Sequence, residues 1–446
     1  MMGGSPPNTP HPGGSADRRI DTPSAEPADR RPADSPSAVP PDRRSVPFGA
    51  LRHRNYRLFF SGMVVSLVGV WMQRVAQSWL VLELTDSAFY VGLAEALGTL
   101  PVLLFSLHAG VLADRVPKHW VVMMTQASSM VLALILAGFV FAGVVTLWHV
   151  LIIAPLLGTA LAFDIPARQS FVVELVGKDD LTSAIGLNSS AFSASRVLGP
   201  AVAGLLISAV GVGMCFLLNG LSYLAVIGAI LAMRLPAAQR RPGPSASSRR
   251  DIRNALRYVA SESRIRMLIL NIAAMSIFGL PVMVLMPVMA RDVLGLGAVE
   301  YGWMMSSVGL GALVGALSLA AFGHRYRRGR VLGRASVAFG VLVVLFAFSR
   351  SLPLGLALLA LNGFAMLTTT ALTNTLLQTI APDELRGRVV SVFALAFLGL
   401  SPFGALQAGF VAERLGAAIA LGIGGVVCVV VAGLGIVRSD VLRDTS

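Results

Sequence analysis

Four charged residues lie inside long apolar stretches, where ionisable side chains are rare and usually functional. They are Arg74, Glu95, Asp164 and Arg196. A carboxylate binds and releases a proton when its basic partner changes, so Glu95 and Asp164 are candidate proton-coupling residues. Arg74 is expected to pair with Glu95 at a similar depth, and Arg168 with Asp164 one helical turn away. Permanent structural pairs are the alternative for both carboxylates. For Arg196, packing is the alternative to binding an anion or substrate.

The apolar stretches around these residues determine the class of protein. The chain has 446 residues, of which 55% are hydrophobic. A helix that spans a bilayer needs about 20 apolar residues and satisfies its own backbone hydrogen bonds. The sequence predicts an all-α membrane protein with twelve transmembrane helices, at residues 57–82, 89–112, 120–141, 147–168, 182–208, 213–235, 265–290, 301–322, 331–349, 352–376, 389–411 and 416–437.

The positive charge predicts how the chain is oriented in the membrane. With twelve spans, all but five of the 36 lysines and arginines fall in alternate loops and in the two tails. Of those five, Arg74 and Arg196 lie within spans, and Arg291, Arg350 and Arg414 lie on the other side. Because cytoplasmic loops carry the excess of lysine and arginine, we expect both termini to be cytoplasmic in a multi-pass cell (inner) membrane protein. The same clustering argues against binding to nucleic acid.

Weak internal similarity indicates a duplicated six-helix unit. The segment Val176–Leu181 is echoed by Ile380–Leu385, and Pro200 by Pro402. We predict a disordered cytoplasmic tail over residues 1–48, because its Pro-, Ser- and Arg-rich composition cannot form a core. Two pseudo-symmetric six-helix bundles then follow over residues 49–235 and 265–438. A cytoplasmic linker with a short amphipathic helix joins them over residues 236–264, and a cytoplasmic tail ends the chain at 439–446.

The turn after the second predicted span carries a family resemblance. Residues 110–118 read GVLADRVPK. They resemble the signature of the major facilitator superfamily, Gly-x-x-x-Asp-Arg-x-Gly-Arg-Arg, with Pro117 and Lys118 where Gly and Arg are usual. The resemblance implies the major facilitator fold and a cytoplasmic gate formed with Gly110, Asp114 and Arg115. A basic turn that only directs insertion is the alternative.

The fifth predicted span carries a second signature. Gly186, Ser195, Gly199, Pro200 and Gly204 follow the superfamily's antiporter pattern, with serine replacing one glycine and alanine, at 203, another. Small residues on one helical face let a second helix approach closely. The pattern resembles that of exporters that exchange drugs for protons, and a general packing face is the alternative. Residues 163–176 and 191–200 resemble the branch that contains the enterobactin exporter and macrolide efflux proteins.

In the fold that the resemblance implies, spans 1, 4, 7 and 10 line a central cavity. The candidate cavity and substrate residues are Gln73, Arg74, Gln77, Arg168, Arg196, Asn271, Asn362, Thr369 and Asn374. Scattered polar groups among methionine, phenylalanine and tryptophan suit bulky, partly hydrophobic small molecules.

We therefore expect a secondary active transporter that exports drug-like or siderophore-like molecules, as a monomer, by proton antiport and alternating access. An importer of the same fold and a non-transporting sensor or scaffold are the alternatives. No metal-ligand spacing, nucleotide-binding loop or nucleophile–base set is found in the spans, so we expect no metal, no cofactor and no enzymatic activity.

Overall fold

The computed structural model describes residues 48–234, 257–323 and 327–437. Within them lie twelve helical segments long and apolar enough to cross a membrane, which confirms the predicted all-α class and the number of spans. Residues 1–47 and 439–446 of the predicted tails, and most of the linker at 236–264, lie outside the described residues. Of the predicted amphipathic helix, only residues 257–263 are described, and 257–261 are helical.

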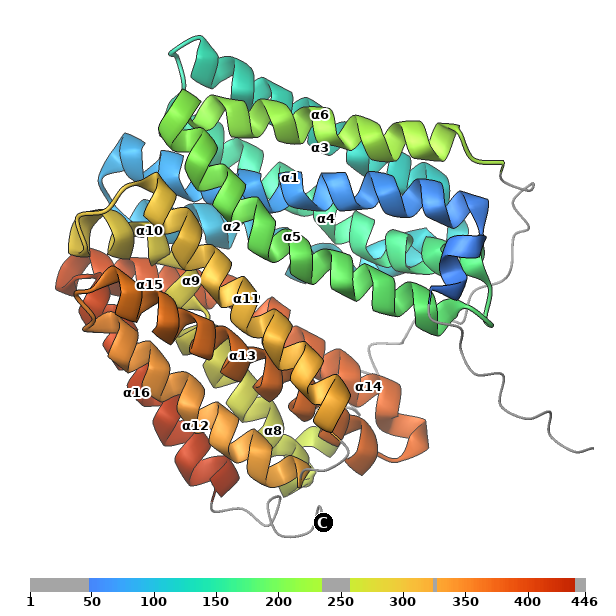
Figure 1. Ribbon diagram of the computed structural model, residues 1–446. Helices are drawn as coiled ribbons and strands as arrows, with labels where there is room; N and C mark the ends of the chain where they lie inside the picture. Colours follow the sequence, from blue (N-terminus) through green and yellow to red (C-terminus); the bar gives the residue numbers. More distant parts are fainter. Residues whose placement is uncertain (1–47, 235–256, 324–326, 438–446) are drawn as a thin grey trace, which may run out of the picture. The chain divides into compact units, whose positions relative to one another are not determined.

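The first half of the chain contributes six long helices (Figure 1). After the short helix η1 (Gly49–Arg52) come α1 (Arg54–Thr85), α2 (Ala88–Arg115), α3 (Lys118–Phe141), α4 (Leu147–Val176), α5 (Leu181–Val210) and α6 (Val212–Leu231). Helix α1 packs against α5 and α6, α2 against α4, and α3 against α4 and α6. Helices α1 to α5 cover their predicted spans, and α4 extends eight residues beyond its predicted end. Helix α6 ends at Leu231, four residues before the end predicted at 235.

The second half contains shorter segments as well as long helices. Its elements are α8 (Ser263–Ala274), η2 (Met275–Gly279), α9 (Pro281–Val284), α10 (Met286–Val288), η3 (Met289–Val293), α11 (Ala298–Phe322), α12 (Arg328–Ala347), α13 (Leu352–Ile380), α14 (Asp383–Ala394), η4 (Leu395–Gly399), α15 (Ser401–Leu415), α16 (Ala417–Val431) and η5 (Ala432–Val437). Helix α13 packs against α11 and α12, and α12 against α16.

Three predicted spans are not continuous α-helices. The span predicted at 265–290 is divided into α8, η2, α9, α10 and the start of η3, and the one at 389–411 into α14, η4 and α15. The span predicted at 416–437 is divided into α16 and the π-helical segment η5. The segments η2 and η4 are π-helical, and Pro281 and Pro402 follow them closely. Proline has no N–H to donate and its ring crowds the preceding turn, so the helix widens just before it.

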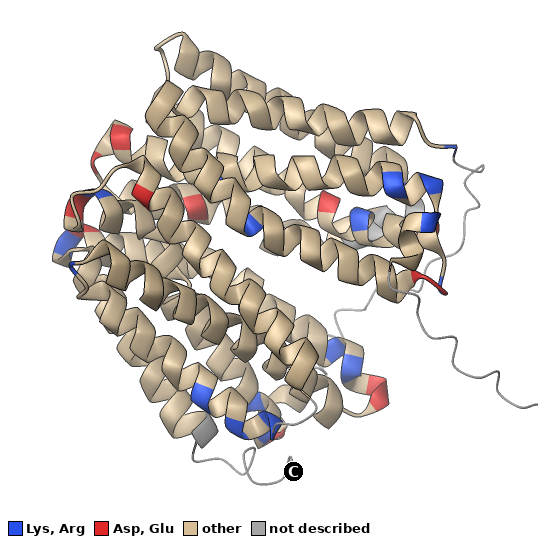
Figure 2. Ribbon diagram, in the orientation of Figure 1, with Lys and Arg blue, Asp and Glu red and all other residues tan. Residues whose placement is uncertain are grey.

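The two helix groups meet along two pairs of helices. Helix α5 packs against α11, and α2 packs against α15. The charged residues collect at the helix ends: most blue segments lie at the end where η1 is found, whereas red segments lie at both ends (Figure 2). Few charges remain in the middle of the spans, and these identify the candidate site.

Candidate functional site

A cavity of about 290 Å³ lies between the two helix groups. Helices α1, α2, α4 and α5 line it from the first half, and α9, α11, α13 and α15, with the π-helical segments η2 and η4, from the second. Only three of its lining residues are charged: Arg74, Glu95 and Arg196. We call it the central pocket. Because both halves contribute to its wall, any movement of one half against the other changes access to it.

Arg74 of α1 and Glu95 of α2 form the expected ion pair. The Arg74 side chain is 47% accessible and that of Glu95 20%, although both lie mid-helix, because they face the central pocket. The indole of Trp71 lies beside the pair, with the Arg74 guanidinium 5.7 Å from its ring centroid. The pair is thus exposed to whatever molecule enters the pocket.

Arg196 of α5 reaches the same indole from the other side of the pocket. Its guanidinium lies 5.7 Å from the ring centroid of Trp71. One terminal nitrogen lies 3.8 Å from the sulfur of Met283 and 3.9 Å from that of Met366. Its Nε is buried and has no hydrogen-bond partner among the described residues. Thioether sulfur is a weak acceptor, so this cation is poorly satisfied by the protein itself.

Asp164 lies outside the central pocket, and its carboxylate has three hydrogen-bond partners. Its Oδ1 accepts from Thr125 Oγ1 at 2.9 Å and from Gln126 Nε2 at 3.0 Å. Its Oδ2 pairs with Arg168 one turn along α4, as the spacing predicts. The Asp164 side chain is 6% accessible. This arrangement ties α3 to α4, and it satisfies the charge locally.

The other candidate cavity residues lie away from the lining of the central pocket. Gln73 accepts from Asn219 of α6 at 2.5 Å, and Asn271 donates to Ser336 of α12 at 3.2 Å. Asn362 donates to the carbonyl of Phe339 at 3.2 Å. Gln77, Thr369 and Asn374 also lie outside the lining. The buried hydroxyl of Thr369 has no hydrogen-bond partner among the described residues, and Asn374 accepts a hydrogen bond from Gln378.

The signature in α5 serves close helix packing at its outer part. A Cβ on Gly199 would lie 2.5 Å from the Cβ of Trp71 in α1. A Cβ on Gly204 would lie 2.6 Å from the carbonyl oxygen of Ala298 in α11. A Cβ on Gly302 in α11 would lie 2.5 Å from the carbonyl oxygen of Pro200. Ser195 is buried. Gly186 has open space around it. The candidate gate residues Gly110, Asp114 and Arg115 form the last turns of α2, and their side chains lie outside the described part.

A set of polar contacts, which the sequence does not predict, joins the two halves at the end of the helices opposite η1. The Glu413 carboxylate of α15 accepts from Ser87 Oγ at 2.9 Å and from the N–H of Phe89 at 3.2 Å, at the start of α2. Arg291 pairs with Asp86 at 2.9 Å and donates to the carbonyl of Leu82 at 3.1 Å. We call these contacts the Glu413–Arg291 clasp. Its partners are distant in the sequence, so no local pattern reveals them.

The charge of Arg291 in the clasp is secured by its neighbours. Partial burial lowers the pKa of Arg291, but hydrogen bonds and attraction from Asp292 and Asp86 outweigh that and raise it above its ordinary value. Arg291 therefore keeps its positive charge at any pH at which the protein is folded.

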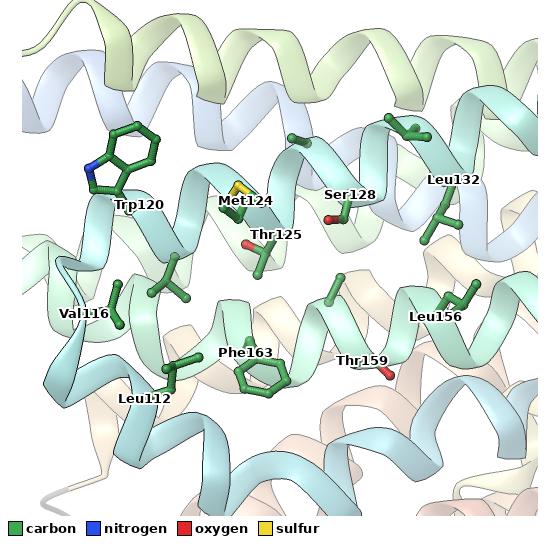
Figure 3. Close-up of a pocket in the computed structure, with 14 residues that line it drawn as sticks. Leu112, Val116, Trp120, Met124, Thr125, Ser128, Leu132, Leu156, Thr159 and Phe163 are labelled. Atoms are coloured by element: carbon green, nitrogen blue, oxygen red, sulfur yellow. The ribbon is translucent and has the colours of Figure 1, made fainter.

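A second hollow, of about 790 Å³, lies between α2, α3 and α4 (Figure 3). Its wall is apolar apart from Thr125, Ser128 and Thr159. Trp120 and Met124, which line it, are also exposed on the surface. In a membrane such a surface faces lipid, so this hollow is distinct from the central pocket. The described residues contain no group of three or more metal-ligating side chains.

Comparison with known proteins gives a consistent result. A family model described as "Transmembrane secretion effector" (MFS_3) matches residues 45–443. The chain is 29% identical to the multidrug efflux pump Tap of Mycolicibacterium fortuitum, over 77% of this chain and 85% of that protein. It is 23% identical to the staphyloferrin A transporter of Staphylococcus aureus, over 81% and 90% of the two chains. It is 24% identical to macrolide efflux protein A of Streptococcus pyogenes, over 82% and 92%.

Solved structures show the same fold at low sequence identity. The nucleoside transporter NupG superposes with a TM-score of 0.70 at 14% identity, over 86% of this chain and 99% of that one. A bacterial homologue of the human lysosomal transporter Spinster superposes with a TM-score of 0.68 at 14% identity, over 88% and 98%. The predicted fold class and the resemblance to the major facilitator superfamily are therefore confirmed.

Proposed function

Because this chain belongs to the transmembrane secretion effector family of major facilitator transporters, we propose that it exports small organic molecules across the cytoplasmic (inner) membrane by proton antiport. The observation that carries this proposal is the central pocket, which both helix groups line. Rocking of one half against the other then exposes the pocket to one side of the membrane at a time. The pocket is complete within one chain, which supports a monomer as the transporting unit.

The distribution of charge supports an orientation with both termini in the cytoplasm. The end of the helices that begins with η1 carries most of the lysines and arginines (Figure 2). Placing that end in the cytoplasm satisfies the preference for positive cytoplasmic loops. The Glu413–Arg291 clasp then closes the outer end. Asp114 and Arg115 fall at the cytoplasmic end of α2, where the signature implies an inner gate. Reporter fusions at the two termini test the orientation, and a periplasmic terminus would contradict it.

Export of drugs or siderophores is supported by the relatives, whose names describe multidrug efflux, macrolide efflux and staphyloferrin A transport. The small residues of α5 that contact α1 and α11 agree with the antiporter signature. Import by the same fold is the competing function, and the direction of transport separates the two.

Two carboxylates are candidates for the coupling proton. Glu95 lines the pocket and holds Arg74, so its protonation would release a cation beside the substrate. Asp164 has three partners and lies outside the pocket, so its protonation would loosen α3 from α4 instead. We favour Glu95, because only its protonation changes a group that the substrate contacts.

Everted membrane vesicles from a host lacking its own exporters test the function. We expect energised accumulation of some members of a panel of drugs and organic acids, and its loss when nigericin collapses the pH gradient. Glu95→Gln should abolish the response to the gradient, whereas the exposed control Glu384→Gln should keep it. Accumulation unaffected by nigericin would refute proton coupling. Uptake found only in right-side-out vesicles would identify an importer.

A further inference from the structure

The central pocket carries one more positive charge than negative. Of its three charged lining residues, Arg74 and Glu95 neutralise each other. Arg196 has no carboxylate within ion-pair distance among the described residues. A cation in the middle of a membrane protein is costly unless a counter-ion or a wet cavity compensates it. The pocket therefore lacks an anion of its own opposite Arg196.

The position of Arg196 makes it available to a ligand. Its guanidinium stands at the wall of the pocket and reaches across from α5 to Met283 of α9 and Met366 of α13. Its contacts are two sulfurs and the face of Trp71, which leave its N–H donors for a better acceptor. Guanidinium groups bind carboxylates through two parallel hydrogen bonds, so a carboxylate is the ligand group that matches this donor set.

The other lining residues of the pocket indicate the chemistry of the rest of that ligand. Beside Arg196, the wall is formed mainly by apolar side chains, among them Leu280, Val284, Met305 and Phe397. The ring of Trp71 lies near both arginines, with each guanidinium 5.7 Å from its centroid. A small inorganic anion would leave these apolar surfaces unused, whereas an aromatic or aliphatic acid would contact them. A cationic drug would be placed against Arg196 and repelled.

We propose that the central pocket binds an amphipathic organic anion, whose carboxylate is bound by Arg196 and whose apolar part packs against Trp71 and the apolar wall. This inference rests on the proposed transport function and names the substrate class. Export of a monovalent anion also runs with the membrane potential, because the cell interior is negative. Arg196 acts here as a binding residue, distinct from the pair that carries the coupling proton.

The experiment compares three naphthyl probes of different charge, of which the acid and its amide have the same shape. Purified full-length protein in lipid nanodiscs is titrated with 1-naphthaleneacetate, its neutral amide 1-naphthaleneacetamide and the cation 1-naphthylmethylammonium, and calorimetry gives each affinity. We expect the acid to bind at least tenfold tighter than the amide, and the cation to bind weakest. Arg196→Gln should remove the preference for the acid and leave the affinity for the amide within about twofold. Arg196→Lys should keep part of the preference, because it keeps the charge without the planar fork.

The matched control is Arg350→Gln, an exposed arginine far from the pocket, which should keep the full preference. Size exclusion and thermal melting establish that each variant is folded. Equal affinity for acid and amide, a preference that survives Arg196→Gln, or no binding of any probe would overturn the proposal. Competition by chloride that removes acid binding would assign the site to inorganic anions instead. Because binding is measured without transport, failure of vesicle export with a retained acid preference would overturn only the proposed function.

Discussion

At the residue scale, the two carboxylates within the spans differ in what surrounds them. Glu95 has one partner, Arg74, and faces the central pocket. Asp164 has three partners and is enclosed between α3 and α4. A charge with one partner can change that partner when the halves move, whereas a charge with three partners mainly stabilises packing. We therefore propose that the two carboxylates serve different purposes in one bundle.

Replacing Asp164 tests its stabilising role. Asp164→Leu leaves Arg168 unpaired and removes the acceptor for Thr125 and Gln126. We expect a loss of about 2–3 kcal/mol in the free energy of unfolding, below the about 3–5 kcal/mol for a fully buried pair because Arg168 is partly accessible. Thermal melting in detergent measures it. Asp164→Asn should lose less, and the exposed control Asp179→Asn should lose nothing. Unchanged melting of Asp164→Leu would contradict this role.

The sequence was sufficient to predict which charged residues pair, but not which uncharged polar residues face the cavity. The pairs Arg74–Glu95 and Asp164–Arg168 follow from depth and from helical spacing. Gln73 and Asn271 were assigned to the cavity from their spans alone, and the structure points them toward α6 and α12. A span's place in the fold does not fix its rotation about its own axis. In a helix that is apolar on every side, no hydrophobic face reveals that rotation.

At the element scale, small residues determine where helices touch. In α5 the predicted signature divides into two parts: Gly199 and Gly204 lie against α1 and α11, while a Cβ added to Gly186 would meet no other helix within 4 Å. The boundaries of most helices were anticipated within several residues, because apolar length is easy to read. The π-helical segments η2 and η4 were not, since proline marks a disturbance without specifying its form.

Gly204 and Gly186 form a matched pair of test positions in α5. Gly204→Val places a side chain against the carbonyl of Ala298, so we expect loss of transport and of about 1–3 kcal/mol of stability from overpacking. Gly186→Ala has space and should behave as the unaltered protein. Vesicle transport and thermal melting measure both. Loss of function in Gly186→Ala with retention in Gly204→Val would show that the signature acts otherwise than by packing.

At the scale of the whole molecule, the two halves are held together at the end of the helices opposite η1, which we propose to be the outer end. The Glu413–Arg291 clasp joins α15 and the η3 turn to the first half. Next to it, α2 and α15 approach so closely that a Cβ on Gly92 would lie 2.4 Å from the carbonyl oxygen of Ala405. We propose that closure at this end leaves the central pocket accessible only from the other side, as alternating access requires.

Gly92→Leu should force the halves apart at the outer end. We expect the population to shift toward the outward-open form, because the leucine cannot fit against Ala405. Spin labels introduced at Leu84→Cys and Leu415→Cys, both exposed at this end, should report a longer distance in pulsed electron resonance. Gly138→Leu, where nothing lies within 4 Å, is the control. An unchanged label distance in Gly92→Leu would contradict the assignment of this contact as the closed outer gate.

The two thioethers beside Arg196 imply a sensitivity to oxidants. Peroxide converts methionine to its sulfoxide, whose oxygen is a strong acceptor. The oxygen of a sulfoxide at Met283 or Met366 would accept a hydrogen bond from the guanidinium of Arg196 and compete with the ligand for it. We expect mild peroxide treatment to lower the affinity for 1-naphthaleneacetate several-fold, methionine sulfoxide reductase to restore it, and a Met283→Leu, Met366→Leu protein to be resistant. Oxidative stress would then silence this exporter reversibly, without any change in its abundance.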